Sequence, residues 1–356
     1  MKIGDREIGM EHPPYVIAEI SCNHGGVIER AYELIDAAAS AGADAVKFQC
    51  YSPHSMTIDS DRPEFVIKDG PWKGQRLYDL YRKTQTPTWW FSRIKERAER
   101  AGIHWFASVF DRQGVDLMVQ LGAPAIKIAS FEITDIPLIR YASATGIPLI
   151  ISTGMASEED IWDALDALAP HGASAHAILH CVSGYPTPVE QADLLRLNLL
   201  DHEFHNYEVG ISDHSVGPYV PIAATALGIS IIEKHFKLFW HPDSEDAAFS
   251  LDELDFAEMV THVKKTWAAI QPSTRESEEP QVGLRRSLYA VTDIAAGDRL
   301  TDDNIRSIRP GGGLAPKYLD SVLGNVAMRD IERGEPLQWD MVDLSWKTSK
   351  TAKAGE

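Results

Sequence analysis

The sequence has no run of about 18 apolar residues, and it has only three cysteines, Cys22, Cys50 and Cys181, with no CxxC pair among them. The first absence argues against a transmembrane helix. The small, odd number of cysteines argues against a disulfide scaffold and favours a reducing compartment. Residues 1–7 also lack the apolar core of a signal peptide. Together these absences predict a soluble, cytoplasmic protein.

Positive charge is scarce as well. The chain has 34 Lys and Arg against 52 Asp and Glu, which gives a net charge of −18. A surface this negative repels nucleic acids and anionic membranes, so neither is an expected partner. An anionic ligand would have to be held in a local cationic pocket. The length of 356 residues and the hydrophobic fraction of 44% allow a true core and about two domains.

Short apolar runs alternate with amphipathic helical stretches between residues 15 and 265. The predicted strands are Val16–Glu19, Ala45–Gln49, Ile103–Ser108, Ala125–Ala129, Pro148–Ser152, Ala177–His180, Glu208–Ile211 and Ser230–Glu233. The clearest predicted helices are Val27–Ala41, Trp89–Ala101, Ser157–Leu168 (with Ser157 as N-cap) and Tyr219–Leu227. Eight such βα units in about 250 residues predict an α/β fold, a (β/α)8 TIM barrel. A doubly wound sheet is the alternative, but no Gly-rich fingerprint follows the first strand.

Two regions interrupt this alternation. Residues 50–88 are too long for a βα loop and carry several large aromatic side chains, which predicts a lid over one face of the barrel. Residues 271–284 are polar and contain proline, as is typical of a linker. The predicted domains are a catalytic barrel over 1–270, a small domain over 285–345 and a disordered tail over 346–356.

Polar residues end every predicted strand. Chemistry in such barrels takes place at the C-terminal ends of the strands, and a purely structural barrel would not need polar groups at all eight. The residues at these ends are Glu19, Lys47, Gln49, Ser108, Lys127, Ser152, His180, Ser212 with His214, and Glu233 with His235.

His214 and His235 are one βα unit apart, so they are expected to leave adjacent strands about 4.8 Å apart. Two imidazoles at that spacing can share one metal ion and leave open coordination positions, as a catalytic metal requires. The other histidines fall on presumed loops, helices and strand starts, where a solvated role is expected.

Lys47 and Lys127 end the second and fourth strands, with serine hydroxyls around the same rim. Two cations with converging hydroxyls predict a phosphate site. The alternatives are that the lysines only pair with neighbouring carboxylates, or that one forms a Schiff base as in a class I aldolase. Carboxylates for acid–base work or for binding sugar hydroxyls are Glu19, Glu132, Glu233 and Asp246.

Several motifs resemble those of the sialic acid synthase family, the phosphoenolpyruvate-condensing nonulosonate synthases. They are residues 18–24 (AEISCNH), 127–132 (KIASFE), 152–155 (STGM), 185–188 (YPTP), 212–215 (SDHS) and 233–236 (EKHF). Residues 309–314 (RPGGGL) resemble that family's C-terminal antifreeze-like (SAF) domain, of β-clip type. Residues 72–74, 77–81 and 316–319, with Phe131 before Glu132, are most similar to the pseudaminic acid branch of the family. One departure is Ser108-Val109, where the family commonly has Thr-Pro.

The resemblance implies condensation of phosphoenolpyruvate with an open-chain N-acylated amino sugar. In the pseudaminic acid branch this sugar is 2,4-diacetamido-2,4,6-trideoxy-L-altrose. It implies a divalent metal on His214 and His235, Mn²⁺ first and Mg²⁺ or Co²⁺ as alternatives, that polarises the aldehyde. The residues implied to hold phosphoenolpyruvate are Lys47, Ser108, Lys127, Ser130, Ser152, Ser183 and Ser212. Those implied to bind or protonate the sugar are Glu19, Gln49, Tyr185 and Asp246.

The resemblance also implies a domain-swapped homodimer. In it the SAF domain covers the partner's barrel, and Arg309 reaches the N-acyl group of the sugar. Phe131 and Phe249 are expected near Glu132 and Asp246, where an aromatic ring suits a 6-deoxy sugar.

Other readings remain open at this point. N-acetylneuraminate and legionaminate synthases are alternatives within the family. A metal-dependent barrel aldolase or isomerase could use the same histidines, and a non-catalytic sugar-binding protein could use the barrel as a scaffold. The polar residues at the ends of all eight predicted strands argue against a barrel that serves only as a scaffold.

Overall fold

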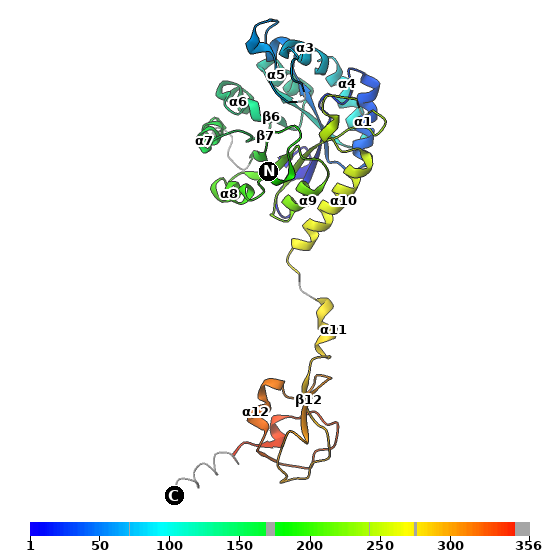
Figure 1. The fold of residues 1–356 in the computed structure, drawn as a ribbon, viewed down its shortest axis with the longest axis vertical. Helices are drawn as coiled ribbons and strands as arrows, with labels where there is room; N and C mark the ends of the chain where they lie inside the picture. The colour runs from blue at the N-terminus through cyan, green and yellow to red at the C-terminus, as the bar shows by residue number, and fades with distance from the viewer. Residues whose placement is uncertain (71, 169–174, 242, 274–275, 346–356) are drawn as a thin grey trace. The chain divides into compact units, whose positions relative to one another are not determined.

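The computed structural model describes residues 1–70, 72–168, 175–241, 243–273 and 276–345 (Figure 1). The chain divides into two compact units, and the division falls between Gln271 and Pro272. This division lies at the start of the predicted linker. The predicted tail, 346–356, lies outside the described residues.

The first unit is a closed barrel of eight parallel strands, which confirms the predicted TIM barrel. The order around the barrel is β3-β4-β5-β6-β7-β8-β9-β10, with β10 pairing back to β3, so the chain follows the sheet without a switch point. The strands are β3 Tyr15–Glu19, β4 Ala45–Cys50, β5 His104–Val109, β6 Ile126–Ile128, β7 Leu149–Ser152, β8 Ala177–Cys181, β9 Glu208–Asp213 and β10 Ile231–His235. They are buried along almost their whole length because side chains fill the barrel on one face and helices cover the other.

Helices surround this barrel (Figure 1). They are α1 Ile28–Ser40, α4 Trp90–Ala101, α5 Arg112–Leu121, α6 Ile136–Ser143, α7 Glu158–Asp166, α8 Arg196–Glu203, α9 Tyr219–Thr225 and α10 Glu253–Ile270. The predicted cap of α7 is present: the Ser157 hydroxyl accepts a hydrogen bond from the Asp160 amide at 3.1 Å. The apolar side of each helix packs on the strands, and together they form one continuous core.

Shorter elements complete the first unit. A hairpin of β1 Lys2–Ile3 and β2 Arg6–Glu7 precedes the barrel. The predicted lid contains α2 Pro53–Met56, the 3₁₀ turn η1 Pro63–Phe65 and α3 Leu77–Thr84. Further 3₁₀ turns are η2 Ser130–Glu132, η4 Val189–Gln191 and η5 Ala247–Phe249.

The second unit has its own small core. Its antiparallel pairs are β11 Ser287–Ala290 with β12 Ile305–Ile308, and β13 Val326–Ala327 with β14 Val342–Asp343. Its short helical elements are η6 Glu276–Glu278, α11 Glu279–Val282, η7 Pro316–Tyr318, α12 Leu319–Val322 and η8 Trp339–Met341. The core side chains include Leu288, Leu300, Val322 and Leu337. The predicted linker is thus helical over residues 276–282.

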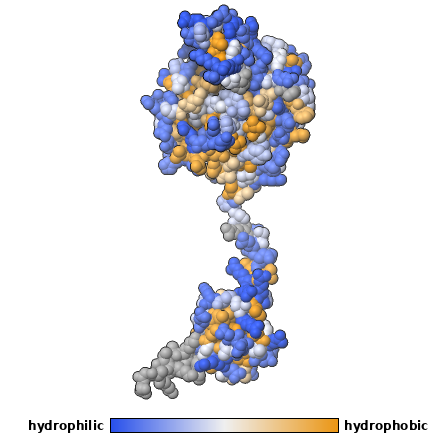
Figure 2. Space-filling view, viewed as in Figure 1, coloured by the Kyte–Doolittle hydropathy of each residue, from blue (hydrophilic) through white to orange (hydrophobic). Residues whose placement is uncertain are grey.

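The surface is mixed in character. On the face seen in Figure 2, polar and apolar residues both reach the surface, as is usual for a folded protein. Within the described residues, no helix is both long and apolar enough to cross a membrane.

Candidate active site

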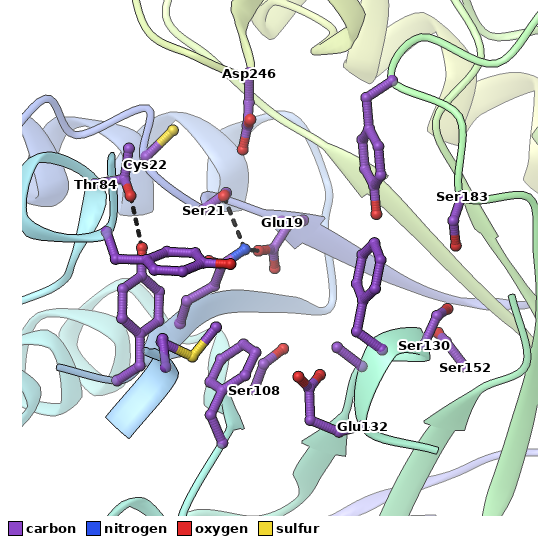
Figure 3. A pocket seen from close by; sticks show the side chains of 18 of the residues that line it. Glu19, Ser21, Cys22, Thr84, Ser108, Ser130, Glu132, Ser152, Ser183 and Asp246 are labelled. Atoms are coloured by element: carbon purple, nitrogen blue, oxygen red, sulfur yellow. Dashed lines mark hydrogen bonds between the residues drawn. The ribbon is translucent and has the colours of Figure 1, made fainter. Parts of the chain in front are cut away.

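A cavity of about 720 Å³ opens at the C-terminal ends of the barrel strands, and every one of the eight strands contributes a side chain to it. Figure 3 shows part of the lining, including Glu19, Ser108 and Ser152. The lining includes all fifteen site residues predicted within the barrel: Glu19, Lys47, Gln49, Ser108, Lys127, Ser130, Glu132, Ser152, Ser183, Tyr185, Ser212, His214, Glu233, His235 and Asp246. Arg309, the sixteenth, lies in the second unit just after β12.

The strand register explains why these residues meet. Glu19 on β3 lies opposite Lys47 on β4, and Ser108 on β5 lies opposite Lys127 on β6. Parallel strands in a barrel are staggered, and side chains at alternate positions point inward. Polar residues at neighbouring strand ends therefore converge on one volume.

Both lysines are buried, and each contacts a serine hydroxyl and a carboxylate. Lys47 Nζ lies 2.8 Å from Ser108 Oγ and 2.7 Å from Glu19 Oε2. Lys127 Nζ donates to Ser152 Oγ at 2.6 Å. Glu233 Oε1 lies between the two cations, 3.6 Å from Lys47 Nζ and 3.8 Å from Lys127 Nζ. Each lysine is thus paired with a carboxylate, as one of the sequence interpretations expected, and each also contacts a serine hydroxyl.

The two carboxylates beside these lysines differ in their pKa. Burial raises the pKa of Glu19 to about 7, even though Lys47 lowers it. Burial also disfavours the charge on Glu233, but Lys127 and Lys47 outweigh it and hold the pKa of Glu233 below its usual range. Burial raises the pKa of Glu132 to about 7 as well. Of these three carboxylates, Glu233 is therefore ionised near neutral pH, and Glu19 and Glu132 can carry a proton.

The hydroxyl groups converge at Gly154, which follows β7. The Gly154 amide donates to Ser130 Oγ at 3.1 Å. A Cβ at residue 154 would lie 2.3 Å from Ser183 Oγ and 2.8 Å from Ser130 Oγ. Only glycine leaves room for both hydroxyls here. The sequence analysis missed this role, although Gly154 belongs to the motif at 152–155.

The rings of His214 and His235 lie next to each other in the cavity, with their centroids 5.3 Å apart. His214 Nδ1 lies 3.1 Å from the Val182 carbonyl oxygen, a contact that places the proton on Nδ1 and leaves Nε2 free as a ligand. His235 Nδ1 is buried without a hydrogen-bond partner, and it lies 3.6 Å from Asp246 Oδ2. Burial lowers the pKa of His235, so its ring is neutral.

This pair fits a shared metal ion. Two imidazoles that each bind one ion at about 2.1 Å place their ring centroids about 4.6–5.3 Å apart for ligand angles from square to tetrahedral. Among the described residues, no group of three or more His, Cys, Asp and Glu side chains could hold a metal ion. An ion here would therefore have two imidazole ligands and several positions open to substrate and water.

The structure corrects the expected positions of two side chains, His180 and Phe249. His180 turns away from the cavity and contacts the Ala192 carbonyl oxygen at 2.8 Å. β8 runs one residue further than predicted, and Cys181, which pairs with Ser212 of β9, points into the cavity as Ser212 does. Phe249 is buried behind the histidines, with its ring centroid 4.8 Å from that of His235, and it does not line the cavity. Phe131 lines the cavity and is 61% exposed.

The segment between β4 and α4 forms one wall of the cavity, as the predicted lid would. Ten of its residues line the cavity: Tyr51, Ser55, Met56, Ile67, Asp69, Trp72, Leu77, Leu80, Tyr81 and Thr84. Trp72 approaches the Tyr185 ring to a centroid distance of 6.0 Å. This wall is largely apolar, in contrast to the floor formed by the strand ends.

A parallel eight-stranded barrel with one polar cavity at the C-terminal ends of all its strands defines the class of a (β/α)8-barrel enzyme. Within that class, the chain belongs to the NeuB family: the family model matches residues 34–275, and a model of the SAF domain matches residues 285–343. These matches confirm the resemblance seen in the motifs and the predicted SAF domain.

Named relatives extend over nearly the whole chain. The chain is 39% identical over 341 residues to a pseudaminic acid synthase of Campylobacter jejuni (strain 81-176), covering 95% of this chain and 98% of the relative. It is 37% identical over 345 residues to the pseudaminic acid synthase of Helicobacter pylori, covering 94% and 100%. Among solved structures, an N-acetylneuraminic acid synthetase of Leptospira borgpetersenii has a TM-score of 0.70 and 30% identity, covering 79% of this chain and 95% of that chain. That these relatives are synthases favours an enzyme over a non-catalytic sugar-binding protein.

Proposed function

We propose that the chain is a pseudaminic acid synthase. It condenses phosphoenolpyruvate with 2,4-diacetamido-2,4,6-trideoxy-L-altrose and water to give pseudaminic acid and phosphate. The observation that carries the proposal is that Lys47, Lys127, the serine hydroxyls and the two histidines all line a single cavity. The similarity to two pseudaminic acid synthases over at least 94% of the chain supports the choice of sugar.

Phosphoenolpyruvate binds at the lysines. Its phosphate and carboxylate replace Glu19 and Glu233 as partners of Lys47 and Lys127, and hydroxyl donors complete the site. The serines with this role are Ser108, Ser130, Ser152, Ser183 and Ser212. Because the anions arrive beside Glu19, they favour its protonated form, which its pKa of about 7 makes accessible.

The sugar aldehyde lies toward the histidines. A divalent ion held by His214 and His235, Mn²⁺ in preference to Mg²⁺ or Co²⁺, would supply Lewis-acid polarisation of the aldehyde oxygen. Carbon 3 of phosphoenolpyruvate forms the new bond to the aldehyde carbon, and the oxygen of that aldehyde takes up a proton. Water then adds at carbon 2 and loses a proton, and phosphate leaves with cleavage of the carbon–oxygen bond.

The roles of the carboxylates in proton transfer differ according to their pKa. Glu19 and Glu132 can donate to the developing alkoxide, because each carries a proton in a fraction of molecules near neutral pH. Glu233 stays ionised and accepts a hydrogen bond from Ser212 Oγ at 2.9 Å. Gln49, Tyr185 and Asp246 contact the sugar from the rim of the cavity.

The test is phosphate release that requires both substrates. Purified protein with Mn²⁺ and phosphoenolpyruvate is offered a panel of acceptors, namely the trideoxy sugar, its legionaminate counterpart and N-acetylmannosamine, and products are read by mass spectrometry. Lys127→Met should abolish turnover, while Lys264→Met, which removes an exposed lysine on α10, should not. Phosphate release without a sugar, or sugar cleavage without phosphoenolpyruvate, would contradict the proposal and favour another reaction class.

The proposal includes a homodimer in which the SAF unit of one subunit covers the barrel of its partner and Arg309 binds the N-acyl group of the sugar. Mass measurement in solution tests the dimer. Mixing Arg309→Ala chains with Glu19→Gln chains should regenerate wild-type composition in about a quarter of the sites if subunits exchange. An inactive mixture despite confirmed exchange would contradict the shared site.

A further inference from the structure

A buried ion pair lies behind the two histidines. Lys234 on β10 and Asp213 on β9 are direct cross-strand neighbours, and Lys234 Nζ lies 2.6 Å from Asp213 Oδ2. The Lys234 side chain is 0% exposed and that of Asp213 is 3% exposed. Because side chains alternate along a strand, both point away from the cavity, and neither is among its lining residues. The pair therefore makes no contact with a substrate in the cavity.

The same pair fixes the backbone on either side of His214. Asp213 Oδ1 accepts a hydrogen bond from the Ser215 amide at 3.0 Å, and Asp213 Oδ2 accepts one from Ser215 Oγ at 2.9 Å. Lys234 Nζ donates to the Ser215 carbonyl oxygen. The His214 carbonyl oxygen itself accepts from the Thr187 amide at 3.0 Å. His214 is thus enclosed by a turn whose polar groups are satisfied by Asp213 and Lys234.

Lys234 is also the residue directly before His235. Asp213 in turn directly precedes His214. The ion pair therefore links the two strand ends that are followed by, or carry, the histidines. Burying two charges costs desolvation energy, and a well-packed apolar pair of similar size is often no less stable. Overall stability is therefore a weak reason for an ion pair at this position.

We propose that Lys234 and Asp213 are positioning residues for the imidazoles of His214 and His235. The buried pair and the Ser215 turn fix the separation of the two rings and hold His214 Nδ1 toward the Val182 carbonyl oxygen. The metal-binding part of this inference rests on the metal site proposed above. The orientation of the rings does not, and it can be measured separately.

The test compares full-length wild type with Lys234→Met/Asp213→Leu, which replaces both charges with apolar side chains and leaves neither partner alone. Val263→Ala, a change in the buried side of α10, is the control for a general loss of core packing. Mn²⁺ affinity is measured by electron paramagnetic resonance on metal-stripped protein, phosphoenolpyruvate affinity by calorimetry and melting temperature by scanning calorimetry. The expected result for the paired variant is a 10- to 100-fold weaker affinity for Mn²⁺, as is typical when partners behind metal ligands are removed. Its phosphoenolpyruvate affinity should stay within about twofold of wild type, and the control should bind Mn²⁺ as wild type does.

A second readout needs no metal. In protein labelled with ¹⁵N-histidine, the imidazole spectrum reports whether His214 carries its proton on Nδ1. We expect that tautomer in wild type and in Val263→Ala, and a mixture in the paired variant. If wild type binds no Mn²⁺ but the tautomer still changes in the variant, the metal proposal is wrong and the positioning role stands. A folded variant with the wild-type tautomer and unchanged Mn²⁺ affinity would overturn the inference. Should the paired variant not fold, Asp213→Asn, which keeps the shape of the side chain, is measured in the same two ways and judged by the same outcomes.

Discussion

Gly154→Ala should weaken the binding of phosphoenolpyruvate while leaving the fold and the acceptor site intact. The added Cβ would lie 2.3 Å from Ser183 Oγ and 2.8 Å from Ser130 Oγ. Ordinary contact needs about 3.5 Å, so the Ser183 hydroxyl must move by about 1 Å and the Ser130 hydroxyl by somewhat less. A hydroxyl that moves this far can no longer donate to a phosphate held by the lysines.

The magnitude follows from the hydrogen bonds that would be lost. One hydrogen bond to a charged group contributes about 1.5–3 kcal/mol, which corresponds to about a 10- to 150-fold change in affinity. We therefore expect the KM and Kd for phosphoenolpyruvate to rise by about that factor, with the KM of the acceptor changed less than about twofold. Phosphate release gives the kinetic constants, and calorimetry gives the Kd without a sugar.

Two further variants isolate the cause. Gly283→Ala is the control, because Gly283 has a helical φ of −60° and a Cβ there would be no closer than 3.8 Å to another group. In a Ser183→Ala background the closest obstacle to the new methyl group is gone, so Gly154→Ala should cost less than it does alone. Fully additive effects, or a rise confined to the KM of the acceptor, would refute the idea that Gly154 is there to let the two hydroxyls converge.

Three other predictions concern the metal, the acceptor and pH. Chelation should abolish turnover, and Mn²⁺ should restore it. His214→Ala or His235→Ala should lower kcat by several orders of magnitude without lowering the melting temperature. Full activity of a chelated, metal-free enzyme would contradict this prediction. The wild-type enzyme should prefer the 6-deoxy acceptor to N-acetylmannosamine by about 10- to 200-fold in kcat/KM. Phe131→Gly should reduce this preference, because removing the ring leaves space for the extra hydroxyl and for a water molecule bound to it. Equal turnover of both sugars by wild type would place the chain in the sialic acid branch. Because burial raises the pKa of Glu132 from 4.5 to about 7, this group stabilises the fold fully below about pH 4.5 and loses that contribution as the pH rises through about 7. Denaturant unfolding between pH 5 and pH 8 should therefore show a fall in stability of up to about 3 kcal/mol that is reduced in Glu132→Gln, and identical pH profiles for the two proteins would count against the raised pKa.

The repeating part of this architecture could be predicted from the sequence alone. Eight short apolar runs, each buried on both faces in the structure, are recognisable because strand burial depends on local composition. Polar residues at their ends predicted which end of the barrel holds the cavity, since all parallel strands of a barrel point the same way. The spacing of His214 and His235 predicted neighbours on adjacent strands, because each βα unit advances the chain by one strand.

Other features depended on which face of the sheet each residue occupies, and this only the tertiary structure decided. The sequence suggested His180 as the cavity-facing end of β8, but Cys181 pairs with Ser212 and lies on the cavity side with it. Because side chains alternate with a period of two, His180 points the other way. The role of Gly154, the position of Phe249 behind the histidines and the pairing of Lys234 with Asp213 were also not predicted from the sequence. Their roles arise from contacts between residues 14 or more positions apart in the chain, at distances of a few ångströms that are set by the barrel stagger and by loop conformation. Composition and periodicity describe one segment at a time, and they do not determine which atoms of different segments meet.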